Sequence, residues 1–158
     1  MTVWIDPLDA TKEYTEGLTE YVTTMIGIAI DGEAVAGVIH FPFTGETHWG
    51  WVEHGNNLLD RNDEAPFNSF VISRSHTGTS ESVLKSAFGE KVKITKAGGA
   101  GAKIIELFNG AAQSYFHDNR IKKWDICAGE AILRSTCYGK FTDMKGERVD
   151  YRFVKYLI

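Results

Sequence analysis

Two aspartates three residues apart, Asp6 and Asp9, follow a short apolar run, and a hydroxyl side chain, Thr11, stands two residues further on. Carboxylates, together with a backbone carbonyl and water, are the hard oxygen ligands that Mg²⁺ binds. The spacing therefore outlines a divalent metal site. A tight turn is the alternative interpretation, because Asp and Pro are common in turns.

A third acidic residue, Asp125, stands far downstream at the head of a helical pattern. Hydrolysis assisted by metal ions needs several carboxylates that converge from separate elements, so Asp125 is a candidate to close the site. Asp125 could equally be a helix N-cap, which is the more common use of such a residue. The two roles can coexist.

The elements that must hold these residues begin with an antiparallel meander from residue 22 to about residue 58. Stretches rich in β-branched or alternating bulky residues are expected to be strands: residues 3–5, 22–30, 34–40 and 47–54. Asp31-Gly32 is a two-residue hairpin signal between two of these strands. Residues 55–57 are expected to turn the chain back.

The second half alternates strand and helix patterns. The expected strands are residues 70–73, 92–95 and 114–117, and the expected helices are residues 80–88, 103–108 and 124–134. Val83, Leu84 and Phe88 lie on one side of the first of these helices. This order of elements predicts a layered α/β fold.

The chain of 158 residues is long enough for one domain with a core, and its net charge is −4. Such a charge gives no reason to expect binding to a nucleic acid polymer or to an anionic membrane. No apolar run approaches the roughly 20 residues that cross a bilayer. Local sites must therefore decide the function.

The segments Asp6-Pro7-Leu8-Asp9-Ala10-Thr11 and Trp124-Asp125-x-Cys127-Ala128 resemble the two signature motifs of the inositol monophosphatase superfamily. Residues 11–18, 73–76, 98–103 and 122–125 are similar to its 3'(2'),5'-bisphosphate nucleotidase branch. Ala10, where many relatives have Gly, and residues 21–25 and 73–78 are most similar to the Golgi-resident form. The resemblance covers about residues 3–151.

This resemblance implies the C-terminal part of a layered α/β/α/β/α sugar-phosphatase sandwich. Residues 1–150 would form a partial domain of this type, and residues 151–158 a divergent tail. The implied activity is a Mg²⁺-dependent phosphomonoesterase that removes the 3'-phosphate of adenosine 3',5'-bisphosphate and leaves AMP and phosphate. The expected partner is therefore a small phosphorylated nucleotide, with a homodimer expected from relatives only.

The resemblance also assigns roles to residues. Asp6, Asp9 and Asp125 would bind Mg²⁺ through carboxylates and Leu8 through its carbonyl, while Thr11 and Asp6 would act on the attacking water. The positions that would hold the nucleotide are Ser73, His76, Gly99 and Lys103. Each has a plainer alternative, because a lone His is usually a surface residue, a Lys a solvated charge and a Gly-rich loop a turn.

The chain is expected to differ from the family pattern in one respect. The resemblance implies that the N-terminal half of the family's domain, which carries paired Glu residues, is missing from this sequence. We therefore expect little or no activity from this polypeptide alone. The rival functions are an inositol monophosphate phosphatase and a noncatalytic nucleotide-binding fragment. A Golgi-lumen location is expected from the resemblance, with any membrane anchor upstream of Met1, and the cytoplasm is the alternative.

Overall fold

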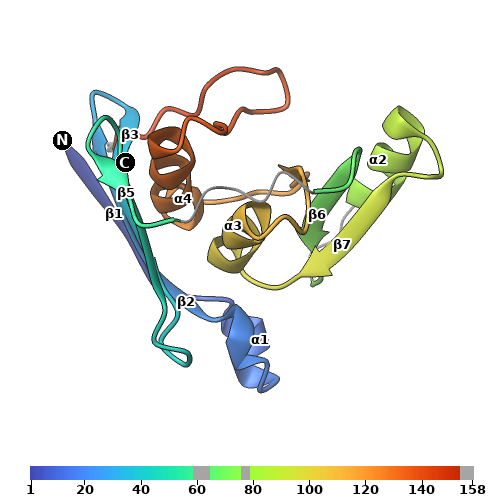
Figure 1. The fold of residues 1–158 in the computed structure, drawn as a ribbon, viewed down its shortest axis with the longest axis horizontal. Coiled ribbons are helices and arrows are strands. Elements are labelled where there is room, and N and C mark those ends of the chain that lie inside the picture. Colours follow the sequence, from blue (N-terminus) through green and yellow to red (C-terminus); the bar gives the residue numbers. More distant parts are fainter. Residues whose placement is uncertain (59–64, 76–78, 154–158) are drawn as a thin grey trace, which may run out of the picture.

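The computed structural model describes residues 1–58, 65–75 and 79–153, which form two β-sheets with helices between and beside them (Figure 1). A five-stranded antiparallel sheet lies on one side, and a three-stranded parallel sheet lies on the other. Helices α3 (Ala100–Phe108) and α4 (Lys123–Ser135) fill the layer between them. The predicted α/β layering is confirmed.

The antiparallel sheet is a meander in which neighbouring strands follow one another in sequence. Its strands are β1 (Thr2–Asp9), β2 (Thr23–Ile30), β3 (Glu33–His40), β4 (Thr47–Trp51) and β5 (Gly55–Asn56). Asp31 and Gly32 both have positive φ, 51° and 89°, as the predicted two-residue hairpin requires. The predicted turn at residues 55–57 is wrong, because Gly55 and Asn56 pair with β4 and the chain reverses just before them.

The parallel sheet has the order β7-β6-β8, with β6 (Ser69–Ser73) in the centre, β7 (Lys93–Ala97) on one side and β8 (Ser114–Tyr115) on the other. Helix α2 (Ser80–Phe88) connects β6 to β7 and α3 connects β7 to β8, so the predicted strand-helix-strand unit is confirmed. The predicted apolar face of α2 is narrower than expected. Only Leu84 is buried, whereas Val83 and Phe88 are exposed.

Helix α4 lies close against the antiparallel sheet because the strands present glycines to it. Gly27 and Gly37 face each other across β2 and β3, and Gly50 follows in register on β4. A Cβ placed on Gly37 would lie 2.1 Å from the carbonyl oxygen of Ala128 in α4. The absence of side chains on this row therefore sets the distance between helix and sheet.

Strand β1 continues through the acidic motif instead of ending at residue 5. Its pairing with β2 shifts between Asp6 and Asp9, so the motif forms an irregular strand end rather than a separate loop. The short helix α1 (Thr11–Thr15) and a 3₁₀ turn, η1 (Thr19–Tyr21), follow. Ala10 joins β1 to α1 with a left-handed backbone, φ 64° and ψ 41°.

Tyr151, the first residue of the predicted tail, is fully buried against α4. Its hydroxyl donates a hydrogen bond of 2.6 Å to Glu130, and its carbonyl accepts one of 2.9 Å from the indole of Trp4. Residues 154–158 lie outside the described residues. No helix within the described ranges is long and apolar enough to cross a membrane.

Candidate active site

A cavity of about 450 Å³ opens where the carboxyl ends of the parallel strands meet the end of β1. In sheets of this kind, ligands bind outside the carboxyl ends of the strands. Most of the residues that the sequence nominated line this cavity: Asp9, Thr11, Ser73, Gly99, Lys103 and Asp125. They come from β1, α1, β6, α3 and α4, so segments more than 100 residues apart in the chain form one site.

Asp6 and Asp125 lie within hydrogen-bonding reach of each other beside this cavity. Burial of the Asp6 carboxyl raises its pKa to about 6, and the charge of Asp9 adds to the shift. Burial also raises the pKa of Asp125. Because the three carboxylates repel one another, a cation between them would relieve the repulsion and return both pKa values toward the ordinary range.

Asp125 also caps the N-terminus of α4, as the sequence allowed, but it does so from inside the first turn and not from the N-cap position. The helix N-cap is Lys122, whose backbone N–H donates a 2.8 Å hydrogen bond to Asp125 Oδ2. Asp125 is thus the third helical residue of a capping arrangement. One oxygen fixes the helix start, which leaves the carboxyl oriented toward Asp6.

Asp9 ties β1 to two helices. Its Oδ1 accepts from the N–H of Ala10 at 2.8 Å, and its Oδ2 accepts from the N–H of Gly101 at 2.9 Å and the hydroxyl of Thr23 at 3.1 Å. The bond to Gly101 satisfies an N–H group in the first turn of α3. Asp9 therefore holds the walls of the cavity in place as well as contributing charge to it.

Thr11 is the first residue of α1 and is exposed at the cavity. Its hydroxyl donates to the carbonyl oxygen of Leu8 at 3.1 Å, and the N–H of Leu8 donates to Asp6 Oδ1 at the same distance. Since the Thr11 hydroxyl donates its hydrogen bond to the Leu8 carbonyl, the lone pairs of its oxygen are left to accept a hydrogen bond from a water molecule.

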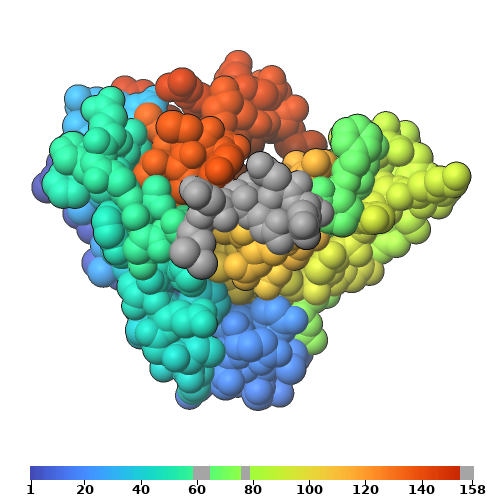
Figure 2. Space-filling view, in the orientation of Figure 1, coloured from blue at the N-terminus to red at the C-terminus, as the bar shows by residue number. Residues whose placement is uncertain are grey.

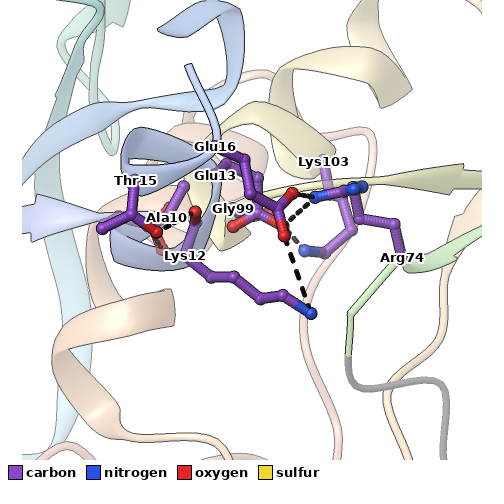
Figure 3. Close-up of polar contacts among 9 residues, drawn as sticks. Ala10, Lys12, Glu13, Thr15, Glu16, Arg74, Gly99 and Lys103 are labelled. Atoms are coloured by element: carbon purple, nitrogen blue, oxygen red, sulfur yellow. Dashed lines mark hydrogen bonds and ion pairs between the residues drawn. The ribbon is translucent and has the colours of Figure 1, made fainter. Parts of the chain in front are cut away.

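Lys103 is not the solvated charge that its alternative interpretation assumed. The side chain is only 3% exposed, and its ammonium donates to the carbonyl oxygen of Gly99 (Figure 3). The ammonium also lies over the ring of Tyr115, 5.3 Å from the ring centroid. Burial lowers its pKa to about 8. A buried cation at the wall of a cavity is suited to hold an anionic group.

The remaining nominated residues have separate surroundings. Ser73 is buried at the end of β6 and lines the cavity. Gly99 has a φ of 57°, and a Cβ there would lie 2.7 Å from the carbonyl oxygen of Tyr21 and 2.9 Å from Asp9 Oδ2, so close packing with the protein itself requires glycine. His76 lies outside the described residues.

Sequence reasoning missed several residues of the cavity wall. These are Lys12, Glu13, Ser75, Tyr115, His117, Asn119, Arg120 and Ile121. Ser75, Tyr115 and His117 lie at or just beyond the ends of β6 and β8. Had the parallel pairing of these strands been assumed, the rule that ligands bind at their carboxyl ends would have nominated all three.

The carboxylates of Asp6 and Asp125 are hard oxygen donors, which fits Mg²⁺. No group of three or more His, Cys, Asp or Glu side chains within the described part of the chain is arranged to hold a metal ion. The oxygens of Asp9 accept three hydrogen bonds from the protein. The chain therefore offers part of a metal-binding set.

Comparison with known sequences agrees with this geometry. The model of the inositol monophosphatase family matches residues 1–158. The chain is 52% identical over 160 residues to inositol monophosphatase 3 of Danio rerio, which covers 96% of the chain and 46% of that protein. It is 46% identical to the Golgi-resident adenosine 3',5'-bisphosphate 3'-phosphatase of Mus musculus, over 96% of the chain and 44% of that protein.

Solved structures share the fold. The crystal structure of 2'AMP-bound SaIMPase-II superposes with a TM-score of 0.77 at 22% identity and covers 94% of this chain and 59% of that one. The chain spans less than half the length of the curated relatives quoted above. The family model matches this chain from residue 1 to residue 158, and both signature segments lie at one cavity. This chain therefore belongs to the inositol monophosphatase family.

Proposed function

We propose that this chain supplies one part of the active site of a Mg²⁺-dependent phosphoric monoester hydrolase that removes the 3'-phosphate of adenosine 3',5'-bisphosphate. The observation that carries the proposal is the meeting of Asp6 and Asp125, 119 positions apart in the sequence, beside a cavity that holds a buried lysine. The Golgi-resident relative supports the substrate, and its name supports a Golgi location.

Asp6, Asp125 and the carbonyl of Leu8 would hold Mg²⁺, with Asp9 as a further carboxylate nearby. When bound, the ion supplies polarisation of the phosphoryl group and acidification of a water molecule. Burial raises the pKa of Asp6, and the negative charges of Asp9 and Asp125 add to the shift. This concentration of negative charge favours cation binding there.

The protein groups orient the reactants. Thr11 accepts a hydrogen bond from the attacking water, which directs the water lone pair at phosphorus. Water forms the new P–O bond and releases one proton to solvent, the bond to the ribose 3'-oxygen breaks, and that oxygen takes up one proton from solvent. Lys103 holds the negative charge of a phosphate that does not react, so the nucleotide stays in register with the water.

Binding to the chain as it stands provides the first test. Calorimetry with Mg²⁺ and adenosine 3',5'-bisphosphate should give Mg²⁺-dependent nucleotide binding that Asp125→Asn weakens at least about tenfold. Asp150→Asn is the matched control, since Asp150 pairs with Arg152 on the surface. Equal binding by the unsubstituted chain and the Asp125 variant would remove the basis of the proposal.

Turnover gives the second test. We expect the isolated chain to release little or no phosphate, because its relatives are about twice as long and the chain offers only part of a metal-binding set. A polypeptide extended to the length of those relatives should release phosphate only with Mg²⁺. Rapid Mg²⁺-dependent release by the 158-residue chain itself would contradict the expected inactivity.

The rival substrate is inositol monophosphate, favoured by the name of the most identical relative quoted above. Lys103 argues for the nucleotide, because inositol monophosphate has no second phosphate for this cation to hold. Relative turnover of the two substrates by the extended polypeptide separates the two functions. Nucleotide binding without turnover would instead indicate a noncatalytic binding protein.

A further inference from the structure

A salt bridge at the edge of the cavity links the segment that follows β6 to the α1 region that follows β1 (Figure 3). Arg74 Nη1 lies 3.1 Å from Glu13 Oε1 and 2.6 Å from Glu16 Oε2. Arg74 follows β6 in the parallel sheet, whereas both glutamates belong to the α1 region that follows β1 in the antiparallel sheet. The guanidinium therefore joins parts of the chain about 60 residues apart.

Glu13 depends on this contact because it is buried. Its side chain is 3% exposed, while that of Arg74 is 30% exposed and that of Glu16 is 36% exposed. A buried carboxylate without a cation is unfavourable. Glu13 also packs on the turn before α3, since a Cβ on Gly98 would lie 2.5 Å from its Cγ. The turn that carries Gly99 is thus part of the same contact.

The backbone holds Arg74 where its side chain can reach α1. The N–H of Arg74 donates to the carbonyl oxygen of Ala97 at 3.0 Å, which extends the pairing of β6 with β7 by one residue. The residues on either side, Ser73 and Ser75, line the cavity. Arg74 itself does not line it, but its side chain reaches Glu13, which does line it, and Glu16 (Figure 3).

Helix α1 needs such a contact. It has only five residues, and a helix of one turn has no stability of its own in water. Its start follows Ala10 in a left-handed conformation, which glycine adopts more easily. Figure 2 shows the α1 segment at the lower edge of the molecule, beside the turn between β3 and β4. Tertiary contacts must therefore fix where Thr11 and Lys12 stand at the cavity.

We propose that Arg74 is a positioning residue: by bridging Glu13 and Glu16 it fixes α1, and through α1 it sets the position of Thr11 at the cavity. The role of Thr11 as the group that orients water rests on the proposed function. The placement of α1 by Arg74 does not rest on it, so the role of Thr11 and the placement of α1 can be disproved separately.

Hydrogen exchange tests the placement without any ligand. In Arg74→Gln the amide protons of Tyr14 and Leu18, which bond to the carbonyls of Ala10 and Glu13, should exchange at least about tenfold faster than in the unsubstituted chain. Amides of β2 and β3 should be unchanged. Arg148→Gln, which removes a surface pair with Glu33, is the matched control and should change neither set.

Two further variants separate positioning from general stability. Arg74→Lys keeps the charge and should restore most of the protection of α1. The double variant Glu13→Gln with Arg74→Gln removes the buried unpaired charge, so it should regain stability while the α1 amides remain fast. Full recovery of α1 protection in the double variant, or unchanged exchange in Arg74→Gln, would overturn the proposal.

Calorimetry with Mg²⁺ and adenosine 3',5'-bisphosphate then links the placement to the site. The double variant should bind the nucleotide about tenfold more weakly than the unsubstituted chain. Equal affinity would show that α1 moves without consequence and would overturn the functional part. If the unsubstituted chain binds no nucleotide, the proposed function fails, and the exchange experiment still decides whether Arg74 holds α1.

Discussion

At the scale of single residues, Ala10 carries strain at the start of the site. Its φ of 64° costs a residue with a Cβ about 1–2 kcal/mol, and glycine avoids this cost. Against the gain stands the larger conformational freedom of an unfolded glycine, about 0.4–1 kcal/mol. Ala10→Gly should therefore raise the free energy of unfolding by roughly 0.5 kcal/mol.

Urea denaturation of the two proteins measures this difference. Ala36→Gly, within β3, is the control and should lower stability because its backbone gains nothing from glycine. A loss of stability in the Ala10 variant equal to that of the control would show that the Ala10 methyl group matters more than the strain.

Burial of the Lys103 ammonium lowers the stability of the fold but places a cation at the wall of the cavity, where it can bind an anion. Burial lowers its pKa from the ordinary 10.5 to about 8. Between pH 8 and pH 10.5, the unfolded chain therefore binds a proton at this lysine that the folded chain does not bind. Stability should therefore rise as the pH increases from 8 to 10.5. Lys103→Met should raise the unfolding free energy at pH 7 by about 1–3 kcal/mol and flatten this pH dependence.

Chemical denaturation at pH 7, 9 and 10.5 measures the slope. The same variant should lose Mg²⁺-dependent nucleotide binding in calorimetry, because the buried cation is absent. Lys96→Met provides the control, since Lys96 is an exposed lysine paired with Glu81. If Lys103→Met leaves the pH dependence unchanged, burial of this ammonium is not the source of it.

At the scale of elements, the glycine row under α4 fixes the spacing of helix and sheet. Gly37→Ala places a methyl group 2.1 Å from the backbone carbonyl of Ala128, where neither element can move without loss of packing. The unfolding free energy should fall by about 3 kcal/mol. Gly139→Ala is the matched control, because its nearest neighbour would be 3.8 Å away, and thermal unfolding of both variants distinguishes them.

Local signals explain which elements could be predicted. Asp31-Gly32 determines its hairpin by itself, and the boundaries of α2 follow from its own composition. The end of β1 could not be predicted in this way, because its continuation through Asp6 to Asp9 depends on pairing with β2. Turn chemistry alone predicts a break there, and the partner strand prevents it.

At the scale of the whole molecule, the sequence indicated which aspartates should meet but not what else would meet them. Asp6 and Asp125 were expected together through resemblance, and the structure brings them together. The pairing of Arg74 with Glu13 and the burial of Lys103 had no local signal. Both depend on the order β7-β6-β8, which brings the ends of three strands to one edge.

The outer face of the antiparallel sheet carries a row of apolar side chains on neighbouring strands. Ile5 pairs with Ile26, Ile26 with Val38, and Val38 with Trp49, and the four are 56, 42, 36 and 40% exposed respectively. A continuous apolar row at a surface promotes association. We therefore expect the isolated chain to self-associate as its concentration rises.

Replacing two members of this row should suppress the association without unfolding the chain. In Ile26→Thr with Val38→Thr, sedimentation velocity should give a concentration-independent monomer, and stability should change by less than about 1 kcal/mol because threonine retains strand preference. Ile39→Thr, at a fully buried position next to Val38, should instead lower stability by about 2 kcal/mol or more. If the double variant associates as strongly as the unsubstituted chain, the exposed row contributes nothing to association and another surface drives it.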